Sequence, residues 1–160
     1  MAVRIYADAS WKNRVAAIAV FQAGRKEPLE QMVIPFPVET PLEAELGALF
    51  MAAELAPPGA VLHTDSAQAH ALVEGRQPLP PKEDVAILVE VIQRNMREKG
   101  LTLCFIGGKR RRRRRRHREL HRLVDFLAKS LLRSQLAETE EDAKETTYPH
   151  ACSPSYPPDS

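Results

Sequence analysis

Apolar positions recur with two different periods along this chain, and the change between them divides the sequence into strands and helices. In the first part, apolar residues alternate with polar ones or form short runs between turn-forming residues, which predicts three strands in an antiparallel meander. These runs are residues 3–8, 15–21 and 29–38. Apolar residues then return every three or four positions, which predicts a helix over residues 42–56, with Thr40 as its N-cap and Pro41 at its first position.

Strands and helices alternate in the rest of the chain. The pattern predicts short strands at residues 60–66 and 101–108, and helices at residues 66–75, 81–100 and 117–136. Strands that are joined through helices lie parallel in one sheet, whereas the first three strands are joined by hairpins. The sequence therefore predicts an α/β protein with a five-stranded mixed sheet, in which three antiparallel strands are followed by parallel strands, flanked by helices.

One folded domain with a disordered tail is the predicted organisation. Hydrophobic residues make up 44% and charged residues 28% of the chain, close to globular averages, so most of it should fold. We assign residues 1–136 to the domain, and residues 137–160, which are acidic and then rich in Pro and Ser, to the tail. Because neither a signal peptide nor a membrane-length apolar run is present, we expect a cytoplasmic protein without a membrane partner. The sequence does not determine the oligomeric state, and a monomer is the favoured expectation.

Positive charge is concentrated in one stretch between the last predicted strand and the last predicted helix. This stretch and Arg118 hold nine of the 23 basic residues, and the fourteen others face 21 acidic residues. A cationic stretch on an acidic body indicates a local contact with a polyanion, and its internal position favours a substrate-binding loop over a localisation signal. We therefore expect nucleic-acid binding by Lys109, Arg110, Arg111, Arg112, Arg113, Arg114, Arg115 and Arg116.

Several acidic residues occupy positions that differ from an ordinary solvated helix face. Asp8 ends the first predicted strand and Asp65 the fourth, and the right-handed crossover rule makes these strands parallel neighbours, so both side chains should lie at one edge of the sheet. Glu43 and Glu45 border opposite sides of the apolar stripe of the first helix, and the period alone does not choose between them. Asp125, in the final helix, can lean over the same edge.

Converging carboxylates repel one another unless cations neutralise them. Ligand sets made only of oxygen atoms favour Mg²⁺ or Mn²⁺ over zinc. The two cysteines, Cys104 in an apolar stretch and Cys152 in the tail, support neither a disulfide framework nor a zinc site. The acidic residues therefore predict a magnesium site beside a polyanion contact.

Four segments of the chain resemble, in order, the signature blocks of type 1 ribonuclease H and its reverse-transcriptase-like relatives. The segments are IYADAS, EAELGALFMAAE, VLHTDS and HRLVDFLAK. The resemblance covers about residues 3–133 and implies the ribonuclease-H-like fold and an endonuclease that hydrolyses the RNA strand of RNA–DNA hybrids. In that family the helix glutamate precedes a leucine, which implies that Glu45 rather than Glu43 belongs to the site.

The resemblance also implies the cofactor and its ligands. Two Mg²⁺ ions, with Mn²⁺ as a possible substitute, would be held by Asp8, Glu45, Asp65 and Asp125. In such two-metal sites one ion generates the attacking hydroxide and the other stabilises the leaving 3′ oxygen.

Some positions depart from the family pattern. The asparagine that usually stands four residues before the helix glutamate is Pro41, and the glutamine two residues after the third acid is Ala67. Those amides help to read the RNA 2′-hydroxyl, and Asn13 and Gln68 are the candidate substitutes.

The family's loop histidine is also replaced, by Lys109. His117, in the longer loop, is a candidate for its role in proton transfer or product release. His121, one turn before Asp125, is a candidate to orient that carboxylate.

Two alternatives to the hybrid nuclease stay open. The first is a nuclease of the same fold that acts on structured DNA, which the replaced 2′-hydroxyl-reading positions favour. The second is a non-catalytic nucleic-acid-binding module of the same fold. The complete set of four acids argues against the second alternative, because a binding module does not need a repulsive cluster.

Overall fold

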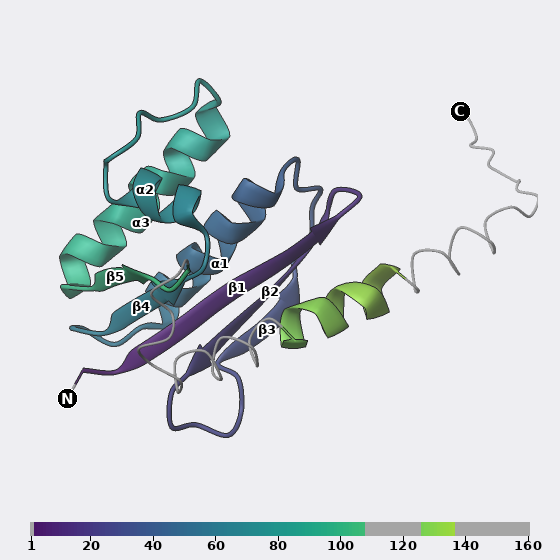
Figure 1. Ribbon diagram of the computed structural model, residues 1–160, viewed down its shortest axis with the longest axis horizontal. Coiled ribbons are helices and arrows are strands. Elements are labelled where there is room, and N and C mark those ends of the chain that lie inside the picture. The colour runs from purple at the N-terminus through teal and green to yellow at the C-terminus, as the bar shows by residue number, and fades with distance from the viewer. Residues whose placement is uncertain (1, 108–125, 137–160) are drawn as a thin grey trace, which may run out of the picture.

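A mixed five-stranded sheet forms the centre of the computed structural model, which describes residues 2–107 and 126–136. The strands are β1 (Arg4–Lys12), β2 (Val15–Gln22), β3 (Glu30–Val33), β4 (Val61–Thr64) and β5 (Thr102–Phe105), and their order in the sheet is β3-β2-β1-β4-β5 (Figure 1). β2 pairs antiparallel with β1 and β3, whereas β4 pairs parallel with β1 and β5. This arrangement confirms the predicted sheet.

Helices cover both faces of the sheet. On one side lie α1 (Pro41–Leu55), α2 (Ala67–Val73) and α3 (Glu83–Lys99). A further helix, residues 126–136, lies on the other side (Figure 1). There Ala128 is buried in a cluster with Tyr6 of β1 and Phe21 of β2. No helix in these described ranges is long and apolar enough to cross a membrane.

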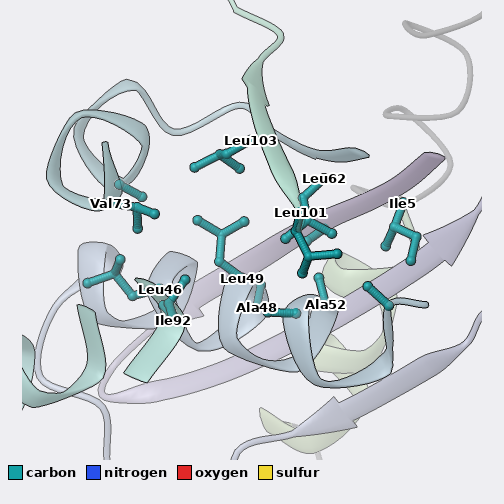
Figure 2. Packing of buried hydrophobic residues seen from close by; sticks show 14 of the residues in the cluster. Ile5, Leu46, Ala48, Leu49, Ala52, Leu62, Val73, Ile92, Leu101 and Leu103 are labelled. Atoms are coloured by element: carbon teal, nitrogen blue, oxygen red, sulfur yellow. The ribbon is translucent and has the colours of Figure 1, made fainter. Parts of the chain in front are cut away.

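The larger core lies between the sheet and α1, and α3 packs on α1 from outside. Because α1 is covered from two directions, small residues suit it. Its buried positions are Ala44, Leu46, Ala48, Leu49, Ala52 and Ala53. Figure 2 shows side chains from the helices and the sheet turned toward one another around Leu49. This packing holds α1 close to the sheet, which allows a side chain near its N-terminus to reach the strands.

The start of α1 is determined locally. Thr40 caps the helix, since its hydroxyl accepts a hydrogen bond from the Glu43 N–H at 3.2 Å, and Pro41 follows as predicted. Gly47 then allows a close approach to the segment that precedes the helix, because a Cβ there would lie 3.2 Å from Ile34 Cδ1. Together these residues place the first turns of α1 beside the strands that carry the predicted site.

All five strands differ in length from the sequence prediction, and β1 and β3 show the physical reasons. β1 continues to Lys12, because its pairing with β2 runs on past the last pair with β4, Tyr6 with His63. The prediction that Asp8 ends this strand was therefore wrong: Asp8 lies inside β1, just beyond the parallel pairing. β3 is shorter than predicted and ends at Val33, before two prolines that lack the N–H needed for a ladder. The predicted tail, residues 137–160, lies outside the described residues.

Candidate metal centre

Asp8 is the buried member of the acidic site. Its side chain points from the middle of β1, opposite Ala19 of β2, and the residue is 2% exposed. The backbone N–H of Ala9 donates hydrogen bonds to Asp8 Oδ1 at 2.9 Å and to Glu45 Oε1 at 3.1 Å. One backbone donor therefore holds two carboxylates from different elements side by side.

The two glutamates near the start of α1 face different partners. Glu45 turns toward β1, where it accepts the hydrogen bond from Ala9. Glu43 turns outward and forms an ion pair with Lys82, next to the start of α3. The packing of α1 thus selects Glu45 for the acidic cluster, which the helical period could not do.

Asp65 enters the site from the turn between β4 and α2. The Ser66 N–H donates to Thr64 Oγ1, and Ser66 Oγ accepts from the Ala69 N–H, both at 3.1 Å. These two bonds fix the turn on either side of the Asp65 side chain. Because Tyr6 pairs with His63 in the parallel register of β1 and β4, the residues two positions further along the chain come to the same level. They are Asp8 in β1 and Asp65 just after β4.

The three carboxylates form a cluster with graded exposure. One oxygen atom from each of Asp8, Glu45 and Asp65 lies within 4.8 Å of the others, and the residues are buried, half-buried and exposed in that order. Burial, followed by repulsion from Asp65, raises the pKa of the Glu45 carboxyl from 4.5 to about 8. Glu45 Oε2 is buried and accepts no hydrogen bond within the part of the chain that the structure describes. A set of three carboxylates that offers only oxygen atoms and is held together against its own repulsion fits a divalent cation.

The raised pKa of Glu45 makes stability depend on pH. In the metal-free protein the folded state binds this proton more tightly than the unfolded state, so stability should fall as the pH rises from about 4.5 to about 8. A divalent cation favours the ionised carboxylate, and the stabilisation by Mg²⁺ should therefore grow over the same interval. Thermal unfolding across this range with EDTA or Mg²⁺ measures both trends. Glu45→Gln should flatten them, and Mg²⁺ stabilisation that is independent of pH would contradict the expectation.

Asn13 lies away from the acidic cluster. Asn13 and Arg14 form the two-residue turn between β1 and β2, with φ values of 50° and 65°, as a tight hairpin requires. At about 3.3 Å per residue, the turn lies about 16 Å along β1 from Asp8. At that distance Asn13 does not reach the carboxylates, and its binding role stays a prediction.

Trp11, the only tryptophan, has a packing role in the structure. Its Nε1–H donates to the Val38 carbonyl at 2.8 Å, and its ring lies against a buried cluster that contains Ala16 and Ala44. These contacts tie the hairpin to the segment before α1.

A buried aromatic stack, which the sequence pattern did not single out, joins β1, which carries Asp8, to β4, which ends just before Asp65. Tyr6 and His63 are both almost fully buried, with ring centroids 4.4 Å apart and planes 11° apart. The Arg4 guanidinium lies 3.5 Å from His63 Nε2. The signal was present in the sequence, because each ring stands two residues before an aspartate of the cluster.

The remaining predicted site residues lie outside the described ranges. They are Asp125, His117, His121, Lys109, Arg110, Arg111, Arg112, Arg113, Arg114, Arg115 and Arg116. The structure therefore brings together three of the four predicted acids and leaves the roles of the others as predictions.

Comparisons with known proteins relate this geometry to solved structures. No model of a known protein family matches the chain, and no curated protein matches it in sequence. The chain is similar to ribonuclease H1 from Halobacterium salinarum, with a TM-score of 0.65 and 16% identity over 84% of this chain and 99% of that one. LC11 ribonuclease H1 from compost, solved in complex with an RNA/DNA hybrid, gives a TM-score of 0.63 and 18% identity over 84% and 99%.

A viral polyprotein matches over one part of its length. The protease–reverse transcriptase of prototype foamy virus gives a TM-score of 0.56 and 20% identity, over 81% of this chain and 20% of the viral chain. Identities at this level establish architecture and not activity. The chain has the ribonuclease H fold.

Proposed function

We propose that this protein is a metal-dependent endonuclease that hydrolyses the RNA strand of RNA–DNA hybrids. The observation that carries the proposal is the convergence of Asp8, Glu45 and Asp65, from three different elements, with oxygen atoms within 4.8 Å of one another. The shared fold with LC11 ribonuclease H1, which was solved with an RNA/DNA hybrid, supports the choice of substrate.

The three clustered acids, with Asp125 as the fourth ligand, would hold two Mg²⁺ ions, and Mn²⁺ could replace them. Bound there, the ions would supply a hydroxide nucleophile and stabilise the leaving 3′ oxygen. Asp8 and Glu45 provide a fixed side of the site, because the Ala9 N–H orients both carboxylates. Asp65 is exposed and forms the side that an incoming phosphodiester meets first.

The other predicted residues have proposed roles in binding and proton transfer. His117 takes over proton transfer or product release from the family's loop histidine, and His121 orients Asp125. Lys109 and the arginines at residues 110–116 bind the phosphate backbone without reading bases. Asn13, at the tip of the hairpin, contacts the hybrid beyond the cleaved position.

A substrate panel tests the proposed function. Purified protein, shown to be folded by circular dichroism, is incubated with labelled RNA–DNA hybrid, duplex RNA and duplex or branched DNA, in Mg²⁺, Mn²⁺ or EDTA. We expect cleavage of the RNA strand of the hybrid with either cation and none in EDTA. Folded protein that cleaves none of these substrates would refute the nuclease.

A nuclease acting on structured DNA is the second candidate. Pro41 at the first position of α1 and Ala67 at the first position of α2 offer no side-chain hydrogen bond to a 2′-hydroxyl. Cleavage of branched DNA alone in the same panel would establish this candidate in place of the hybrid nuclease.

A further inference from the structure

An aromatic side chain lies exposed at the edge of the sheet that carries the acidic cluster. Phe105 is the last residue of β5 and is 39% exposed. Its Cα pairs with that of Thr64, and the Ile106 N–H donates to the Thr64 carbonyl at 2.9 Å. Because paired strands lie about 5 Å apart, the backbone of Phe105 is directly beside the residue that precedes Asp65.

The ring of Phe105 is held in place from two sides. A Cβ at Gly107 would collide with the ring, so the chain after β5 passes close to it only because residue 107 is glycine. From α2, the His70 ring lies with its centroid 6.1 Å from that of Phe105, at an interplanar angle of 40°. An exposed phenylalanine with such close neighbours has a defined orientation rather than a free choice of rotamers.

A positive charge accompanies the ring. The Arg76 guanidinium donates a hydrogen bond to His70 Nδ1, while His70 Nε2 lies 3.8 Å from the Glu74 carboxylate. Because His70 Nδ1 accepts this hydrogen bond, the proton of a neutral His70 imidazole lies on Nε2. Arg76 is itself exposed to solvent. We call Phe105, His70 and Arg76 the Phe105 patch.

We propose that the Phe105 patch binds a nucleic-acid strand beside the acidic cluster, with the Phe105 ring stacked on a base and the Arg76 guanidinium on a phosphate. An exposed ring gives sequence-independent stacking, and a nearby cation tracks the backbone, which is the combination that nucleic-acid channels use. His70 and Gly107 act as positioning residues for the ring. The inference rests on the proposed function, because it assigns a contact for the substrate of that site.

Hybrid binding in EDTA, measured by fluorescence anisotropy at several salt concentrations, tests the patch without requiring cleavage. We expect Phe105→Leu to weaken binding on the order of tenfold with an unchanged salt slope, because stacking releases no counterions. Arg76→Gln should weaken binding and reduce the slope by about 0.9, the value of one phosphate contact. Gly107→Ala should behave like Phe105→Leu, since it displaces the ring.

Matched variants distinguish the effect of the patch on hybrid binding from the effect of removing any exposed aromatic or positive residue. Phe36, 65% exposed before α1, and Arg97, exposed in the last turn of α3, lie outside the patch, so Phe36→Leu and Arg97→Gln should bind like the wild type. Phe105→Tyr keeps an aromatic ring and should bind the hybrid like the wild type. This result would exclude a purely structural effect of Phe105→Leu.

The outcomes distinguish the inference from the function beneath it. If the wild type binds the hybrid and both Phe105→Leu and Arg76→Gln bind equally well, the patch is refuted and the proposed function stands. If the wild type does not bind the hybrid in EDTA, the patch is refuted, and the cleavage panel decides the proposed function separately. If Phe105→Tyr binds the hybrid as weakly as Phe105→Leu does, the Phe105 ring serves folding and the stacking contact is refuted.

Discussion

Asp8→Asn should abolish cleavage of an RNA–DNA hybrid while the protein still binds the hybrid. Asparagine preserves the size of the buried side chain, and its Oδ1 can still accept the hydrogen bond from the Ala9 N–H. It removes the negative charge that a divalent cation needs. Because a bound cation contributes several kcal/mol to the transition state, we expect the rate to fall by at least about a hundredfold.

Single-turnover cleavage and anisotropy on the same preparation measure the two halves of this prediction. The chain offers a matched control on α1, where Glu45 faces the cluster and Glu43 pairs with Lys82. Glu45→Gln should lose cleavage, whereas Glu43→Gln should lose only an ion pair near the surface and keep its activity. Equal losses in the two glutamine variants, or an Asp8→Asn protein with the wild-type rate, would contradict the proposed metal centre.

Replacement of Arg110 to Arg116 by a Gly/Ser segment of equal length should weaken hybrid binding and flatten its salt dependence. The basis is charge, because without this stretch the acidic residues of the chain outnumber the basic ones. Each phosphate contact contributes about 0.9 to the slope of log affinity against log salt on duplex DNA. We expect the slope to fall by about three or more, which corresponds to several lost contacts.

A variant with seven lysines in the same positions is the control for charge alone. It should keep most of the slope, because lysine also neutralises phosphates, although it lacks the bidentate geometry of arginine. An unchanged slope in the Gly/Ser variant would show that the arginines do not contact the backbone, whatever happens to cleavage.

The elements of this fold could be predicted where their signals are local. The capping hydroxyl of Thr40 and the proline after it act within one turn of helix, so the start of α1 was correct to within one residue. Strand ends were predicted less well. β1 extends to Lys12 because β2 continues to pair with it, and such a partner is not visible in the alternation of β1 itself.

In the acidic site, too, local signals could be predicted from the sequence and contacts between elements could not. A helical period gives the angle at which a side chain leaves its helix, and by that measure Glu43 and Glu45 were equivalent. The resemblance to ribonuclease H favoured Glu45, and the packing of α1 against β1 places that residue against the Ala9 N–H. The packing role of Trp11 likewise depends on a distant residue, since its indole N–H donates to the Val38 carbonyl.

The sequence by itself determined the order of strands and helices, the cap of α1, the candidate acidic residues and the concentration of arginines, because each depends on neighbouring residues or on composition. Only the tertiary structure decided that Asp8, Glu45 and Asp65 meet within 4.8 Å and that the pKa of Glu45 rises to about 8. Distance, burial and repulsion arise between elements that are far apart in the chain, so a periodic pattern cannot express them.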